Sequence, residues 1–469
     1  MSVPYSTVLV IILYLAVITT FGSWLGRKRK SVSDYFLAER SVPWWAVAAC
    51  IVATETSVLT FTSVPGFAYT GDWSFLQLAF GYIAGRLLIA GFLIPAYFEG
   101  RVFTSYELLH QKFGSSVRSV AASVFLVYRT LADGIRLHAA ALVVAIAIGV
   151  PETYCVLLLA AAMILYTEEG GVKATVWTDV VQMIVYVFGA FVILDAVASG
   201  LGEPGIRSAL GSARESGKLR VLVMSLDPGT TYTLLSGFVG GAFLTLATHG
   251  TDHYLVQRLL VARSARAASV GLVVSGFVVL AQFVLFLLIG TLLFEHYSGR
   301  AFPRGDEVLP HFIAESLPGP VLGFILAAVV AAALSPSLNS LASTTLKDFY
   351  LPYVDSDASE RKQIRLGRIF TVFWGVAQTL VALYAQRAPS ALEAGLAALS
   401  FASGPTVGAF LMAIANRNLR SLGVLIGMGI GLVTPFLMNH WTPVAWTWNV
   451  AIGAAVTFAV GNTVSAALR

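Results

Sequence analysis

WWAVAACIVATETSVLTFTSVPGFAYTG, residues 44–71, begins as an apolar run and carries polar side chains in its middle. These polar residues, followed by a proline and a glycine, are Thr54, Glu55, Thr56, Ser57 and Thr60, then Pro65 and Gly66. Hydroxyl and carboxyl groups compete with backbone hydrogen bonding, and a non-helical backbone at membrane depth is tolerated only beside a protein-lined cavity. The stretch therefore predicts a membrane helix that unwinds at a binding site. The alternative is a Ser/Thr-rich packing face with the proline in a terminal turn.

A second interrupted stretch lies at 319–346. It contains Leu334-Ser335-Pro336-Ser337-Leu338-Asn339-Ser340 and then Ser343-Thr344-Thr345. A proline removes one helix hydrogen bond and frees carbonyl oxygens for a ligand or an ion. Two interrupted spans separated by regular ones are typical of secondary transporters built from repeats.

The composition around these stretches excludes a water-soluble protein. Of the 469 residues, 57% are hydrophobic and 12% are charged, whereas soluble domains carry roughly 25% charged residues. The net charge of +5 is spread over short clusters between apolar runs, which does not make a nucleic-acid-binding face. Because strand alternation of the barrel kind is absent, we expect an all-α polytopic protein of the cell membrane, with the lipid bilayer as its surroundings.

At roughly 20 apolar residues per crossing, the sequence predicts about 13 transmembrane helices. We place them at 6–26, 44–70, 74–98, 117–148, 152–167, 172–198, 231–256, 267–295, 319–346, 366–386, 390–416, 419–439 and 443–467. Arg27-Lys28-Arg29-Lys30 follows the first apolar run directly, and no basic residue precedes that run. This charge order predicts an N-terminus outside and, after an odd number of spans, a cytoplasmic C-terminus.

The function class follows from what surrounds the spans. The longest outer loop, 199–230, fits a surface helix or a flexible cover, and the connector 347–365 is charged; neither resembles a catalytic domain. Metal-ligand and nucleophile motifs of membrane enzymes are absent. Cys50 and Cys155 both lie in apolar runs and build no disulfide framework. We therefore expect a transporter of a small-molecule solute, not an enzyme, with no organic cofactor.

Several short motifs resemble the sodium/solute symporter family. In chain order they are Asp34-Tyr35-Phe36-Leu37-Ala38, Pro43-Trp44-Trp45, Tyr106-Glu107-Leu108-Leu109, Phe113-Gly114, Tyr166-Thr167, Gly170-Gly171, Trp177-Thr178-Asp179, Gln257-Arg258, Ser337-Leu338-Asn339-Ser340, and Asp348 with Tyr350. The resemblance implies a leucine-transporter-like five-plus-five inverted repeat and alternating access. The expected units are 1–43 (first helix and basic loop), 44–198 (first half), 199–230 (outer loop), 231–416 (second half) and 417–469 (two added helices).

The resemblance also implies where sodium would bind, and here the sequence departs from the family pattern. Carbonyl positions of the main sodium site map to Ala53, Thr56 and Val329, but its two hydroxyl positions map to Ala332 and Ala333. A second site keeps a carboxylate as Asp179 and one hydroxyl as Ser335, while the neighbouring position is Pro336. Because protein oxygens must replace the hydration shell of sodium, losing these ligands weakens binding.

Two interpretations of coupling follow. In one, water and backbone oxygens complete the site, and weak sodium coupling survives. In the other, the protein is a proton-linked or uncoupled carrier of the same fold. Carboxylates inside a membrane are functional candidates, and the proton candidates are Glu55, Asp133 and Asp179.

The predicted fourth span carries Arg129, Asp133 and Arg136 on one helix face. Asp133 could neutralise one arginine and leave Arg136 to bind an anionic group of the solute; the alternative is an internal ion-pair network. Depth and resemblance also place Thr60, Gln77, Thr248 and His249 near the solute. If Arg136 faces the cavity, the solute carries a carboxylate; otherwise sugars, amino acids and nucleoside-like solutes remain open.

Overall fold

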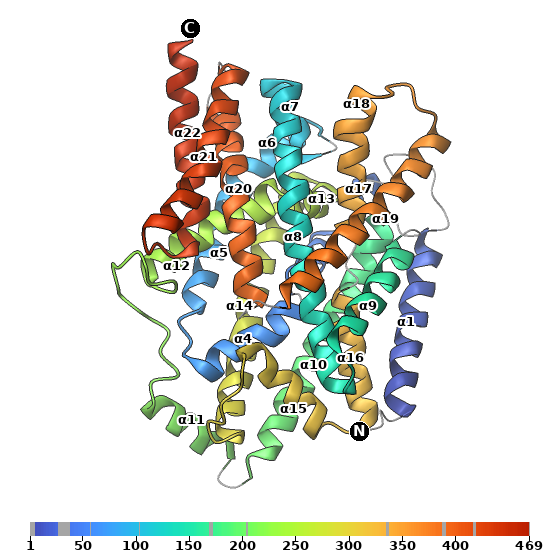
Figure 1. Ribbon diagram of the computed structural model, residues 1–469, viewed down its shortest axis with the longest axis vertical. Coiled ribbons are helices and arrows are strands. Elements are labelled where there is room, and N and C mark those ends of the chain that lie inside the picture. Colours follow the sequence, from blue (N-terminus) through green and yellow to red (C-terminus); the bar gives the residue numbers. More distant parts are fainter. Residues whose placement is uncertain are drawn as a thin grey trace.

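The computed structural model describes residues 5–26, 38–56, 58–102, 104–167, 172–202, 205–333, 337–386, 391–415 and 419–468. Within these ranges the chain is helical, with one isolated parallel bridge between Val42 and Ala262 in place of any strand. The helices form a single bundle in which α21 (Ser421–Trp441) and α22 (Asn449–Ala467) run side by side at one edge (Figure 1). The first helix, α1 (Tyr5–Gly26), packs on the other side of the bundle against α16 (Gly319–Ala333).

Among the described residues, seven helices are long and apolar enough to cross a membrane, and an eighth span is obtained when one bent pair is counted as a unit. The long helices include α8 (Ser115–Ile148), α10 (Val172–Gly200), α14 (Ala265–His296) and α19 (Glu360–Ala385). The segment Leu76–Glu99 is another, made of α5 (Leu76–Leu88), the π-helix η2 (Ile89–Leu93) and α6 (Ile94–Glu99). The chain is therefore a multi-pass membrane protein.

Four more predicted spans fall on α1, α9 (Glu152–Thr167), α16 and α20 (Ala391–Ala415), in which the apolar stretch that the structure describes is shorter. Each predicted segment contains between one and three helical elements, but the count of about 13 crossings stays a prediction, as do the inverted repeat and the boundaries of the five units. Surface helices that the sequence did not predict individually are α7 (Ser105–Phe113), α15 (Val308–Ser316) and α18 (Leu351–Tyr353).

The predicted break in 44–71 is confirmed. Helix α3 (Trp44–Glu55) ends where the polar cluster begins, and α4 (Val58–Thr70) continues at 62° to it. Thr56 caps α3 with a ψ of 83°, which no helical residue adopts. Pro65 does not end α4, because it lies inside the helix. The interruption therefore comes from the hydroxyl and carboxyl cluster, whereas the proline is accommodated in the outer half-helix.

Helix α4 is held against its neighbours by backbone contact. A Cβ atom on Gly290 of α14 would lie 2.0 Å from the carbonyl oxygen of Pro65, and one on Gly66 would lie 2.6 Å from that of Gly305. Only a residue without a side chain permits such approach. The two glycines thus fix the outer half of the broken span between α14 and the 305 turn.

The second predicted break lies at residues 334–336, which are outside the described residues. On either side the structure describes α16, ending at Ala333, and α17 (Ser337–Thr344), which continues into the π-helix η5 (Thr345–Tyr350).

A break that the sequence analysis did not predict lies in the segment 231–256. Helix α12 (Leu234–Thr245) changes into the π-helix η3 (Leu246–Thr251), Asp252 is extended with a ψ of 119°, and α13 (His253–Leu260) starts afterwards. The Asp252 carboxylate accepts a 2.7 Å hydrogen bond from the Tyr254 amide and so caps α13. The signal was the polar run Thr248-His249-Gly250-Thr251-Asp252 in an otherwise apolar segment.

Candidate solute and ion site

The end of α3 meets η3 through a buried charged cluster. Glu55 forms an ion pair with Arg86 of α5, whose side chain is fully buried. His249 Nε2 lies 3.4 Å from the Glu55 carboxylate and 3.3 Å from the Arg86 guanidinium. Thr248 Oγ1 and His249 Nδ1 are 2.8 Å apart, which orients the imidazole ring. The cluster therefore joins the break after α3 to the element that precedes the break at Asp252.

Thr56, the cap residue of α3, is also tied to a neighbouring helix. Its hydroxyl donates a 2.6 Å hydrogen bond to the side-chain oxygen of Gln282 on α14. Both side chains are buried. The break is consequently stabilised by side chains in place of the missing helix hydrogen bonds, as irregular backbone at membrane depth requires.

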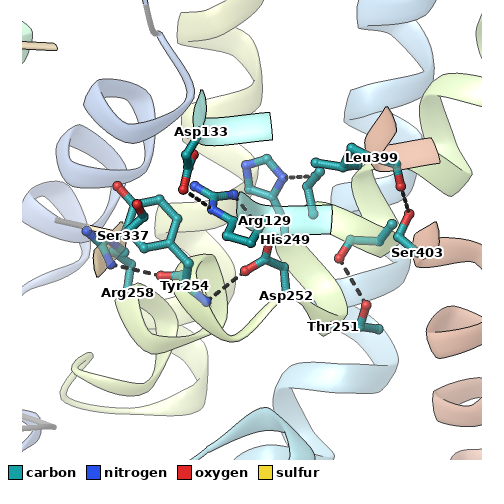
Figure 2. A network of polar contacts seen from close by, with 12 residues as sticks. Arg129, Asp133, His249, Thr251, Asp252, Tyr254, Arg258, Ser337, Leu399 and Ser403 are labelled. Carbon is teal, nitrogen blue, oxygen red and sulfur yellow. Dashed lines mark hydrogen bonds and ion pairs between the residues drawn. The ribbon is translucent and has the colours of Figure 1, made fainter. Parts of the chain in front are cut away.

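A second buried cluster lies around α13 (Figure 2). Arg129 of α8 donates to Asp133 at 2.9 Å and lies 3.2 Å from the Asp252 carboxylate. The Tyr254 ring is sandwiched between two guanidinium groups, that of Arg129 at 4.1 Å and that of Arg258 at 4.0 Å. This stacking is the cation–π arrangement that arginine prefers.

Arg258 extends this cluster to α10 and α3. Its Nη2 lies 3.6 Å from the Asp179 carboxylate, which also accepts from Cys50 Sγ at 3.1 Å and from Thr54 Oγ1 at 3.4 Å. Cys50, which lies in an apolar run of the sequence, thus has a polar partner. The carboxylate predicted for a second ion site is therefore in contact with an arginine in this structure.

The second cluster carries an excess of negative charge. Its carboxylates are Asp133, Asp179 and Asp252, and its guanidinium groups are Arg129 and Arg258. One Asp133 oxygen, Oδ1, is buried and accepts no hydrogen bond from the described residues. An unbalanced carboxylate in a low-dielectric interior is costly, and a bound cation or a proton relieves that cost.

Arg136 lies one turn beyond Asp133 on α8 and outside this ion-pair network. Its Nε is buried and has no hydrogen-bond partner among the described residues, and the same holds for the Tyr186 hydroxyl of α10. The two groups are close enough to interact electrostatically. The Tyr186 ring lies 6.3 Å from that of Phe61, near the start of α4. The Arg136 Nε and the Tyr186 hydroxyl are therefore two buried hydrogen-bond donors beside the broken span, and they could both bind an anionic group of a ligand.

The other predicted solute contacts lie in different surroundings. Thr60 is buried in α4. The Gln77 side chain donates to the Tyr232 carbonyl at 2.9 Å and accepts from the Val223 amide at 3.2 Å. Gln77 therefore contacts the backbone of the outer loop, whereas Thr248 and His249 belong to the Glu55 cluster.

The loop between α10 and α12 contacts the C-terminal end of α4. Its surface helix, α11 (Gly205–Glu215), is followed by Lys218, whose amino group donates to the Tyr69 carbonyl at 2.7 Å at the C-terminal end of α4. Burial lowers the pKa of Lys218 below its ordinary value. Arg220 forms a 2.7 Å ion pair with Asp72. Burial raises the pKa of Asp72, but hydrogen bonds from Ser74 and Arg220 outweigh burial, so the pKa is lowered. A surface helix and a cover are thus both present in this loop.

A separate ion pair closes the opposite end of the bundle. Arg118, at the start of α8, pairs with Asp348 of η5 and donates to the Lys347 carbonyl at 3.2 Å. These elements lie at the same end of the molecule as the C-terminus (Figure 1).

The predicted sodium positions are only partly described. Ala53 and Val329 are buried near the ends of α3 and α16. Helix α16 ends with Ala332 and Ala333. Ser335 and Pro336 lie outside the described residues. In the described part, the polar groups that sequence reasoning did not assign to the site are Arg86, Tyr186, Asp252, Tyr254, Arg258 and Gln282. A signal existed for Asp252, which follows the polar run of η3, and for Arg258, which belongs to the Gln257-Arg258 motif.

Comparison with known proteins gives a consistent result. The profile of the sodium:solute symporter family matches residues 35–431. Among curated relatives, the sodium/sialic acid symporter NanT of Aliivibrio fischeri is 27% identical over 459 residues, covering 96% of this chain and 90% of the relative. The human sodium/iodide cotransporter is 28% identical over 443 residues, covering 90% of this chain and 67% of the relative.

Solved structures show the same fold. A Na⁺-coupled sialic acid symporter in a substrate-bound, outward-open state matches with a TM-score of 0.89 at 24% identity, covering 99% of this chain and 98% of that one. Mhp1, a nucleobase-cation-symport-1 family transporter, matches with a TM-score of 0.57 at 16% identity, covering 92% and 94%. The chain therefore belongs to the sodium:solute symporter family, whose members are membrane transporters and not enzymes.

Proposed function

We propose that the protein is a secondary active symporter that carries a small polar organic solute together with a cation across the cell membrane by alternating access. The observation that carries this proposal is the 62° break between α3 and α4. Glu55 at this break contacts His249, which lies just before the second break at Asp252. Facing interruptions of this kind at membrane depth are the places where transporters bind their cargo.

We further propose that the solute is an anion, most simply a carboxylate. The Arg136 Nε and the Tyr186 hydroxyl are buried donors without acceptors in the described part of the chain. A carboxylate would accept from both, since guanidinium and carboxylate groups match in charge and geometry. Several relatives are named for acids or anions, namely sialic acid, iodide and monocarboxylates.

Charge balance supplies a reason why solute and cation would bind together. Arg136 lies one turn from Asp133 on α8, beside the cluster around Tyr254, in which three carboxylates face two guanidinium groups. A carboxylate solute bound at Arg136 would add a further negative charge. A cation or a proton near Asp133 would then balance that charge, so each ligand would raise the affinity of the other by the same factor.

The identity of the cation has two candidates. The relatives named above are sodium-coupled, which favours sodium. The replacement of both hydroxyl ligands by Ala332 and Ala333 favours the alternative, a proton-linked or uncoupled carrier. Glu55, Asp133 and Asp179 are the carboxylates that could carry the proton. We also propose the five-plus-five repeat with one helix before and two after, and an N-terminus outside with a cytoplasmic C-terminus.

Uptake into proteoliposomes tests the proposal. The purified chain is reconstituted, and labelled carboxylates, sugars and amino acids are offered with an inward sodium gradient, with an inward proton gradient, or with neither. Accumulation against a concentration gradient in either of the first two conditions supports symport and names the cation. Equilibration without accumulation identifies an uncoupled carrier, and no uptake of any solute contradicts a transport function.

A further inference from the structure

A cavity lies at the start of α3, away from the proposed solute site. Its volume is about 340 Å³, and its lining residues are Ser41, Val42, Pro43, Trp45, Trp177 and Arg263. None of these residues is acidic. The volume is within the range of roughly 300–1,000 Å³ in which proteins bind small molecules or parts of them.

The rim of this cavity is held by backbone pairing. The Val42 amide donates to the Val261 carbonyl at 3.1 Å, and the Arg263 amide donates to the Val42 carbonyl at 3.1 Å. The Arg263 Nε donates to the Ser41 carbonyl at 2.8 Å. The base of the guanidinium is therefore fixed, and at this exposed position its two terminal nitrogens have no hydrogen-bond partner among the described residues. A guanidinium presented in this way can bind a phosphate through two parallel hydrogen bonds.

One wall of the cavity is aromatic. Trp45 of α3 and Trp177 of α10 meet edge to face, with ring centroids 5.6 Å apart. Trp45 is 47% exposed although it lies in an apolar helix. Tryptophan at the end of a membrane helix marks the headgroup level of the bilayer, where one part of the ring is apolar and the other is wet.

Two further arginines lie near the lining segment, which itself contains no acidic residue. Arg40 precedes the lining segment directly, and Arg266 lies one turn beyond Arg263 at the start of α14. An arginine cluster beside interfacial tryptophans is the arrangement that attracts the headgroups of anionic lipids. A solute site is disfavoured here because the cavity lies at the start of α3 and after the end of α13, and not at the break after Glu55 or at Asp252.

We propose that this cavity binds the phosphate of an anionic phospholipid headgroup, held by the Arg263 guanidinium, with the Trp45 and Trp177 rings against the glycerol and the first methylene groups. The lipid would bridge α3, α10 and the turn before α14. This inference does not depend on the proposed solute or on its coupling.

Native mass spectrometry of the full chain in detergent tests the proposal, with phosphatidylglycerol, phosphatidylcholine and glycerol phosphate as probes. We expect one phosphatidylglycerol to be retained per chain, at least tenfold more tightly than phosphatidylcholine. Arg263→Gln should weaken this retention about tenfold. The matched control, Arg207→Gln, removes the same charge from an exposed position on α11 that does not line the cavity, so it should leave retention unchanged.

Three results would overturn the proposal: equal retention of both lipids, equal loss in the two variants, or displacement of phosphatidylglycerol by an equal concentration of glycerol phosphate. The last result would assign the cavity to a soluble phosphate ester. Should Arg263→Gln fail to fold, Arg263→Lys keeps the charge without the paired donors, and an intermediate loss of retention is then expected.

Discussion

Glu55, the last residue of α3, forms an ion pair with Arg86 of α5, and the arginine side chain is fully buried while that of the glutamate is 14% exposed. The pair lies where the helix hydrogen bonds of α3 end. Because His249 of η3 contacts both members, one ion pair connects both interrupted spans. A buried guanidinium without its carboxylate would be strongly unfavourable, so this contact fixes the geometry of the break.

The first prediction concerns this pair. Glu55→Gln should destabilise the protein by about 3 kcal/mol, because breaking a buried pair leaves an uncompensated charge. Arg86→Gln should cost about as much. The double variant should cost clearly less than both changes together, since it leaves no unpaired charge. Thermal unfolding in detergent measures all three.

The matched control is a second double-mutant cycle, which combines Glu55→Gln with Arg207→Gln. Arg207 is exposed on α11, so the two changes in this control should act independently. If the losses of stability are additive in the Glu55–Arg86 cycle as well as in the control, Glu55 and Arg86 are not energetically coupled.

The break after α3 could be predicted because its cause is local. Four consecutive polar residues, Thr54 to Ser57, interrupt an apolar run, and this pattern needs no knowledge of the neighbours. Pro65, in contrast, gave a misleading local signal. Its carbonyl fits against Gly290 of α14, and only tertiary packing shows why the helix continues through it.

The charged clusters could be predicted less well, since their partners are far apart in the sequence. The Arg129–Asp133 contact follows from helix spacing. The contacts of Asp252 with Arg129 and of Asp179 with Arg258 join residues from different helices. A single sequence does not show which residues of different helices are neighbours. It therefore indicated Asp179 as a functional carboxylate, but it could not identify Arg258 as the arginine beside it.

The second prediction concerns the solute. Arg136→Gln should raise the KM for a carboxylate solute about 30-fold, because a paired charge-assisted hydrogen bond contributes about 2 kcal/mol. Tyr186→Phe should raise it about five- to tenfold. Neither change should affect thermal stability much, because neither polar group has a partner among the described residues. Arg207→Gln is the control for loss of one positive charge. Unchanged KM in both site variants would remove Arg136 and Tyr186 from the solute site.

The third prediction is a pH dependence of the outer cover. The pKa of Asp72 is lowered in the folded protein, so its ion pair with Arg220 stabilises the fold above the ordinary aspartate pKa of about 3.9 and is lost as the pH falls through the lowered value. Because the Arg220 side chain is 64% exposed, we expect at most about 1 kcal/mol. Asp72→Asn should therefore lower the Tm slightly at pH 7, and this difference should shrink as the pH falls below about 3.9 and disappear below the lowered pKa. Arg220→Gln should show the same pH profile. A Tm difference that persists at the lower pH would contradict the linkage.

The fourth prediction concerns the cation. If Ala332 and Ala333 stand where sodium ligands are missing, Ala332→Ser with Ala333→Ser returns two oxygens to the end of α16. The sodium concentration for half-maximal uptake should then fall about tenfold, which corresponds to 1.4 kcal/mol of added binding free energy. Uptake driven by a proton gradient should stay the same, since the proton candidates lie on α3, α8 and α10. Ala327→Ser, which adds a hydroxyl to the same buried helix two turns before the site, is the control and should not change the sodium requirement. An equal sodium requirement in the double variant and in the control would show that water and backbone oxygens already complete the ion site, and the argument from the missing hydroxyls would fail.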